Sequence, residues 1–123
     1  MLACVLACVA LSAEAADRMR AGLWVGTTTT KDRTHNTSNC LAQSDVDAMN
    51  GDAKSIQAYL EKSIPPSICK LSDFKVNGDD VVYTTVCGNT PANVVTTKYH
   101  GNSFESTTSS GTKSSAKLTG ACK

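Results

Sequence analysis

Two strand-like runs, 69–76 and 80–87, flank Asn77-Gly78-Asp79 and predict a β-hairpin. Asn-Gly between such runs is a strong signal for a tight turn. A three-residue loop places Cys69 opposite Cys87, and the other pairs it predicts are Val76 with Asp80, Phe74 with Val82 and Ser72 with Thr84. A two-residue loop at Asn77-Gly78 would shift the register by one residue and lose the match between the cysteines.

Strand periodicity divides the side chains of this hairpin between two faces. We expect the core face to carry Phe74, Val76, Val82 and Val86. The opposite face would carry both cysteines together with Leu71 and Tyr83.

A second hairpin is predicted over residues 93–100 and 103–109, with Gly101-Asn102 as a two-residue loop. Its register pairs Tyr99 with Phe104, Lys98 with Glu105 and Thr96 with Thr107. An aromatic pair, an ion pair and a threonine pair are the cross-strand neighbours that stabilise a sheet, so this prediction rests on side-chain chemistry as well as on the turn.

Two further strands complete the predicted sheet. Residues 22–31 contain Trp24, Val25 and four successive threonines, which is a composition typical of strands. A turn at Ser110-Gly111 leads to a last strand over residues 113–119. That strand has few large apolar residues, so we expect it to be a polar edge strand.

The helical signals lie between the first strand and the first hairpin. Ser44 precedes acidic residues and is the predicted N-cap of a short helix that ends near Gly51, and Asp52 is placed to cap a second helix. The second helix ends before Pro65-Pro66. Its apolar stripe, which we expect to pack on the sheet, consists of Ile56, Tyr59, Leu60 and Ile64. The predicted fold is therefore mainly β, an antiparallel meander or partly open barrel with one or two short helices.

The first residues resemble a signal peptide. Residues 1–11 are almost entirely Leu, Ala, Val and Cys and are followed by Ala13-Glu14-Ala15, so we expect a signal peptide over 1–15 and a single β domain over 16–123. The apolar run is too short to cross a bilayer, which takes about 20 residues. No Lys or Arg precedes it, so we expect the true start to lie upstream. Lipidation of Cys8 is the less favoured alternative, because the residues after Cys8 stay apolar as far as Ala13.

Four cysteines follow this leader: Cys40, Cys69, Cys87 and Cys122. Four thiols behind a leader indicate an oxidising compartment, most simply the periplasm, and two disulfides with three conceivable connectivities. The hairpin register favours Cys69 with Cys87, which leaves Cys40 with Cys122.

Charge excludes some partners. The chain has 12 Lys and Arg against 11 Asp and Glu, or 10 once Glu14 leaves with the signal peptide, for a net charge of about +2. The basic residues are scattered singly, so we expect no nucleic-acid partner. We expect a monomer whose partner is a small molecule or an envelope protein.

The chain resembles a known family in a set of short motifs. They are Arg20-Ala21-Gly22-Leu23-Trp24, Asn39-Cys40-Leu41, Cys69 with Asp73-Phe74-Lys75, Cys87, and Gly120-Ala121-Cys122. The sequence is thereby similar to the bacterial exported domain-of-unknown-function family 3617, and the resemblance implies an exported, mostly antiparallel β domain with four cysteines. Where that family usually has Pro-Gly-Leu-Trp-Glu, this chain has Ala21 and Val25 in place of the proline and the glutamate. The resemblance implies no activity.

No catalytic or metal motif stands out. The acidic cluster that starts at Asp45 lacks the spacing of a calcium loop, because the glycine position is Asn50 and the glutamate position is Ile56. His35 and His100 have no metal-ligand spacing, and both are expected in loops. The cysteines are expected to be bridged, and no serine lies in a nucleophile elbow. We therefore expect no metal, no cofactor and no enzymatic activity.

Trp24 is the remaining residue of interest. The favoured interpretation is a core tryptophan that fixes the first strand. The functional interpretation is an aromatic wall for a small ligand, with Trp24, Tyr83 and Tyr99 as the ligand-facing candidates and Phe104 nearby. Two alternatives stay open: a hydrolase-like enzyme whose site forms only in three dimensions, and an interaction protein whose edge strand adds to a partner sheet.

Overall fold

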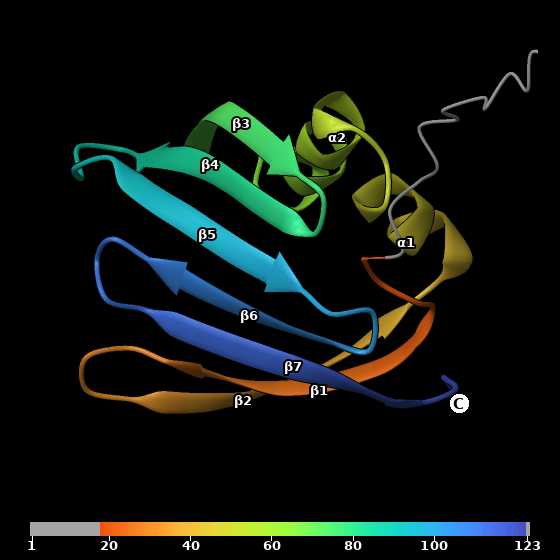
Figure 1. The fold of residues 1–123 in the computed structure, drawn as a ribbon. Helices are drawn as coiled ribbons and strands as arrows, with labels where there is room; N and C mark the ends of the chain where they lie inside the picture. Colours follow the sequence, from red (N-terminus) through yellow and green to blue (C-terminus); the bar gives the residue numbers. More distant parts are fainter. Residues whose placement is uncertain (1–17, 123) are drawn as a thin grey trace, which may run out of the picture.

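The computed structural model describes residues 18–122, and its strands form one antiparallel sheet in the order β2-β1-β7-β6-β5-β4-β3 (Figure 1). The strands are β1 (Gly22–Thr29), β2 (Thr34–Leu41), β3 (Cys69–Asn77), β4 (Asp80–Cys87), β5 (Asn93–Tyr99), β6 (Ser103–Thr108) and β7 (Lys113–Gly120). Strands β3 to β7 form a meander, and β1 joins it beside β7. The sheet ends at β2 and β3, so the predicted mainly β, open architecture is confirmed.

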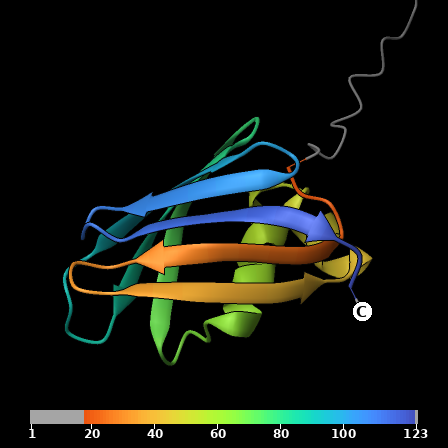
Figure 2. The same cartoon turned by 90° about the horizontal axis from the view of Figure 1, so that it is seen from below.

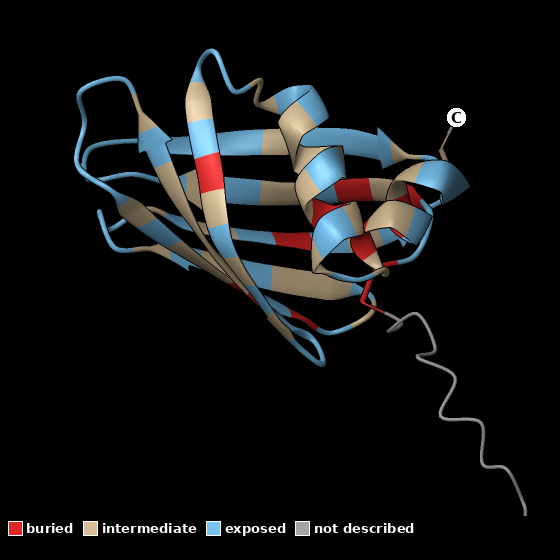
Figure 3. Cartoon of the chain, turned by 90° about the horizontal axis from the view of Figure 1, so that it is seen from above, coloured by how far each residue is buried: buried red, intermediate tan, exposed pale blue. Residues whose placement is uncertain are grey.

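Helices α1 (Gln43–Met49) and α2 (Ala53–Ser63) lie at one end of the curved sheet, against its inner face. Seen from below, β7, β1 and β2 run in front of the helices (Figure 2). Buried residues gather where the helices meet the strands (Figure 3). This core joins Val46, Met49 and Ile56 from the helices to Trp24, Val81, Tyr99 and Ala116 from the strands.

The stripe on α2 packs as expected. Ile56 is 0% exposed, and Tyr59 and Leu60 pack against the core. Asp52 caps this helix, because its Oδ1 accepts the Ser55 N–H at 2.9 Å. Ser44 is not the N-cap of α1, however. Ala42 holds that position, and Asp45 accepts the Ala42 N–H at 2.8 Å, so the carboxylate stabilises the helix start from inside the first turn.

The first hairpin corrects two predicted pairs. Its loop is Gly78-Asp79, with Gly78 in the left-handed region at φ 61°, and so Asn77 pairs with Asp80. The pairs Val76 with Asp80 and Phe74 with Val82 are therefore wrong. A bulge between Ser72 and Lys75, with Asp73 at φ 56°, then adds one residue to β3 and restores the other pairs. As a result Ser72 lies opposite Thr84, and Cys69 lies opposite Cys87, as predicted.

The predicted core face of this hairpin is wrong for β4. Val81 is 1% exposed, whereas Val86, expected in the core, is 37% exposed. The two-residue loop sets the odd-numbered residues of β4 inward, so Tyr83 and Cys87 share the face of Val81. In β3 the bulge reverses the alternation, and so Leu71 is buried on one side of it while Phe74 and Val76 pack against the core on the other.

The second hairpin has the predicted register, with Tyr99 opposite Phe104 and Lys98 opposite Glu105. Strand β7 is not the polar edge that we expected, because it lies between β1 and β6. The edge on that side is β2, a strand without an alternating apolar pattern, which contains His35 where a loop was expected.

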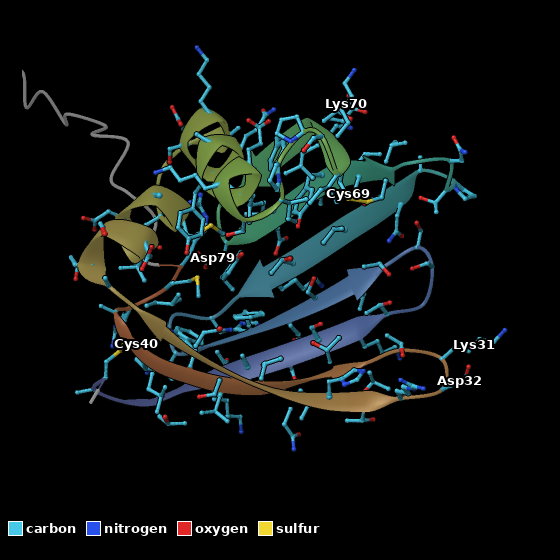
Figure 4. The ribbon with its side chains drawn as sticks, turned by 180° about the vertical axis from the view of Figure 1, so that it is seen from behind. Lys31, Asp32, Cys40, Cys69, Lys70 and Asp79 are labelled. Carbon is cyan, nitrogen blue, oxygen red and sulfur yellow. A yellow bond between two sulfur atoms is a disulfide. The ribbon has the colours of Figure 1, made fainter. Side chains whose placement is uncertain are left out.

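Two disulfides join Cys40 to Cys122 and Cys69 to Cys87, as favoured from the hairpin register (Figure 4). The expected signal peptide and the alternative lipid site at Cys8 lie outside the described residues.

Candidate functional site

A cavity of about 300 Å³ lies on the inner face of the sheet. Strands β1, β2, β4, β5, β6 and β7 all contribute to it, and its lining combines hydroxyl and aromatic side chains. The lining includes Thr28, Thr37, Asn39, Tyr83, Thr97, Tyr99, Phe104, Ser106, Ser114 and Ala116.

A row of hydroxyl groups crosses four adjacent strands on this face. Thr28 Oγ1 and Ser114 Oγ are 3.0 Å apart, which links β1 to β7. Thr97 Oγ1 donates to Ser106 Oγ at 3.0 Å, which links β5 to β6. The two pairs are neighbours because Ser106 and Ser114 are partners in the register between β6 and β7. Cross-strand hydroxyl pairs stabilise a sheet modestly, and here they also form a continuous polar surface.

Aromatic rings form the other part of the cavity lining. The centroids of Tyr99 and Phe104 are 5.7 Å apart and the rings are tilted, while Tyr83 stacks on Phe74 at 4.9 Å. Edge-tilted and offset aromatic pairs are favourable, so the rings hold one another in place. The cavity therefore has rigid apolar surfaces beside its hydroxyl row.

Trp24 lies behind this wall. It is 2% exposed, its ring is 5.7 Å from that of Phe104, and its Nε1 donates to Arg20 O at 2.9 Å. Trp24 is not among the residues that line the cavity, whereas Tyr83 and Tyr99 are. The structure thus supports the core interpretation of Trp24, and ligand contact by the two tyrosines stays a prediction.

The inner face of the sheet carries no Asp, Glu, Lys or Arg among the described strand residues outside the bulge at Asp73. Pleat alternation and the strand registers place all the others on the outer face: Lys70, Lys75, Asp80, Lys98, Glu105, Lys113 and Lys117. Lys70 can be seen pointing away from the body in Figure 4. The cavity is therefore suited to an uncharged molecule.

The phenols of the cavity are neutral at ordinary pH. Burial raises the pKa of Tyr83 above 10.0. Burial, with a smaller contribution from the nearby Tyr83, also raises the pKa of Tyr99. Both side chains keep their protons, and the partly exposed Tyr83 can donate a hydrogen bond to a ligand.

A larger hollow of about 650 Å³ lies on the outer face. It is lined by exposed side chains, including Glu105 and Lys117, and by His100 in the turn between β5 and β6. His100 Nε2 is 3.3 Å from Glu105 Oε1. Because these charged groups are solvated and Phe104, which is partly buried, is the only Phe, Tyr or Trp among the described residues that line the hollow, the inner cavity is the better candidate site.

The structure assembles no evident metal site in residues 18–122, where no group of three His, Cys, Asp or Glu could hold an ion. Asp45 serves the start of α1, and the four cysteines form the two bridges. Within the same range no helix has the length and apolar character needed to cross a membrane.

Arg18 has a structural role that sequence reasoning missed. Its buried guanidinium donates to Gly78 O at 2.8 Å, Gly51 O at 2.8 Å and Met49 O at 3.1 Å. It thereby joins the chain before β1 to the end of α1 and to the β3–β4 turn. Asn50 adds a reciprocal pair of hydrogen bonds to the backbone of Met19, at 2.8 and 2.9 Å.

The model of one protein family, described as "Protein of unknown function (DUF3617)", matches residues 19–122. The chain belongs to this family. The match covers every strand and both helices, so the expected family membership is confirmed. No curated protein and no solved structure gives a significant match.

Proposed function

We propose that this DUF3617 protein is an exported, non-enzymatic binding module that takes a small neutral ligand in the cavity on the inner face of its sheet. The observation that carries the proposal is the composition of that cavity: hydroxyl groups from four strands beside the rings of Tyr83, Tyr99 and Phe104, on a face without charged strand residues. Binding sites commonly combine apolar walls with a few well-placed polar groups.

Export is supported by the two disulfides, because such bridges persist in oxidising compartments. We propose the periplasm, reached through a signal peptide over residues 1–15. Expression with the leader in an exporting bacterial host, followed by intact mass analysis, tests this: a mature chain that starts at Ala16 with both bridges formed is expected. A lipid mass on Cys8 would instead show a membrane-anchored protein.

The binding proposal is tested with cyclohexanol, a neutral ring with one hydroxyl group. Trp24 is the only tryptophan and contacts Phe104 at the cavity, so its fluorescence reports on occupancy. We expect a saturable response to cyclohexanol and none to cyclohexanecarboxylate, which brings a charge that the cavity cannot pair.

Two matched variants show whether the fluorescence response to cyclohexanol comes from binding at the inner cavity. Ser106 and Ser103 lie on the same strand, but Ser106 lines the inner cavity and Ser103 lines the outer hollow. Ser106→Leu should narrow the cavity and weaken the response, and Ser103→Leu should leave it intact. A response that survives Ser106→Leu undiminished, or that disappears in Ser103→Leu alone, would contradict binding at the inner cavity.

A second candidate function is strand addition, in which the edge strand β2 pairs with a strand of a partner protein. The eight residues of β2 contain no Lys, Arg, Asp, Glu or proline, and its pairing with β1 is regular, so it lacks the usual features that protect an edge from pairing. We expect a monomer in light scattering, as the cavity-based function requires no self-association. A dimer that Ser38→Pro dissociates would favour strand addition at β2 instead.

A further inference from the structure

We infer that the ligand of the inner cavity is a neutral saccharide. This inference rests on the proposed function and deepens it, because it names the class of molecule that the hydroxyl row and the aromatic wall would recognise together.

The hydroxyl row requires a ligand that both donates and accepts hydrogen bonds. A Ser or Thr hydroxyl offers one proton and two lone pairs. Each of the two pairs, Thr28 with Ser114 and Thr97 with Ser106, uses one proton for its own hydrogen bond. The second proton of each pair has no partner among the residues that the structure describes, so each pair presents a donor and several acceptor positions to the cavity. Sugar hydroxyls have this same dual capacity.

The aromatic wall suits the apolar side of a sugar ring. A pyranose presents C–H groups on its face and hydroxyls around its edge. Phe104 and Tyr83, both partly exposed, supply ring surface to the cavity, and the buried ring of Tyr99 lies 5.7 Å from that of Phe104 and holds it in place. The lining thus separates an apolar wall from a polar row, as the two parts of a pyranose require.

The volume of the cavity and the absence of charged side chains among the described strand residues around it limit which saccharides can bind. The cavity volume of about 300 Å³ lies at the small end of ligand clefts, which favours one or two sugar rings. The charged strand residues outside the bulge lie on the outer face, so an acidic or amino sugar would lose water without gaining an ionic partner. A purely apolar ligand would in turn leave the two free hydroxyl protons without acceptors.

The test measures binding of four probes to the full mature chain by calorimetry: glucose, maltose, glucuronate and cyclohexanol. We expect glucose and maltose to bind more tightly than cyclohexanol, and glucuronate to bind at least tenfold more weakly than glucose. Tighter binding of maltose than of glucose would support a glycan chain as the natural source, and the reverse order would support a free sugar.

A pair of serine variants separates recognition from folding. Ser106→Ala removes a hydroxyl of the row, and Ser103→Ala makes the same change on the outer face of the same strand. We expect Ser106→Ala to weaken saccharide binding by about tenfold, the usual effect of one lost hydrogen bond, and to leave cyclohexanol binding nearly unchanged. Ser103→Ala should change neither affinity. Thermal unfolding of both variants checks that each is folded.

The outcomes distinguish the inference from the function on which it rests. If cyclohexanol binds in the cavity and no saccharide does, the saccharide inference is overturned and the binding function stands. If none of the four probes binds, both are overturned. Equal binding of glucuronate and glucose, or loss of saccharide binding in Ser103→Ala rather than Ser106→Ala, would also overturn the inference.

Discussion

Removing the two disulfides one at a time should destabilise the protein by different amounts. The bridge between Cys40 and Cys122 spans 82 residues, and that between Cys69 and Cys87 spans 18. A disulfide stabilises mainly by restricting the unfolded chain, and the loop-entropy relation gives about 4.5 kcal/mol for the long loop and about 3.2 kcal/mol for the short one. All four cysteines are exposed or only partly buried, so replacing them with alanine removes little packing.

The assay is urea unfolding of the Cys40→Ala/Cys122→Ala and Cys69→Ala/Cys87→Ala variants, followed by the fluorescence of Trp24. We expect the first variant to lose about 1.3 kcal/mol more unfolding free energy than the second. The reasoning would be refuted if removal of the Cys69–Cys87 bridge cost as much as, or more than, removal of the other bridge. A free thiol in the oxidised mature wild-type protein, which lacks Cys4 and Cys8, would refute the pairing itself.

Three further predictions concern the packing and ionisation of single residues. Gly26→Ala should lower the unfolding free energy by about 1 to 3 kcal/mol in the same urea assay, because its Cβ would lie 2.7 Å from the Cα and Cβ of Ala116. Arg18→Met should cost about 2 to 4 kcal/mol, because three backbone carbonyls lose a charged donor, and Arg18→Lys should recover part of that loss. Burial raises the pKa of Tyr99 in the folded state, so its contribution to stability is complete below the unfolded pKa of about 10 and declines as the pH rises above it. The unfolding free energy of the wild type should therefore fall more steeply with rising pH, above the unfolded pKa, than that of Tyr99→Phe. An identical dependence on pH in the two proteins would contradict the raised pKa of Tyr99.

The second hairpin could be predicted because its signals are local. Gly101 is in a tight turn at φ 81°, and the side chains on either side of it are complementary in the correct register. The loop of the first hairpin was predicted with three residues because, in regular strands, only that length places Cys69 opposite Cys87. The structure reaches the same pairing with a two-residue loop and a bulge at Asp73. The bulge could not be predicted, because a non-glycine residue with positive φ is uncommon in a strand and has no distinct sequence signature.

The inner cavity could not be predicted, because its parts come from strands far apart in the sequence. Thr28 and Ser114 are separated by 86 positions, and only the insertion of β7 between β1 and β6 brings their hydroxyls together. Strand β7 was expected at an edge since it has few large apolar residues. Its inward residue Ala116 is small because the rings of Trp24 and Phe104, on the strands at either side of β7, lie 5.7 Å apart and fill the space above it.

The most direct test of the ligand site is a ¹H–¹⁵N correlation spectrum of the labelled protein, titrated with glucose. We expect the largest shifts of the backbone amides around Thr28, Thr97, Ser106 and Ser114, which come from four different strands and whose side chains all line the inner cavity. Shifts that gather instead around His100 and Lys117, on the outer face, would contradict it.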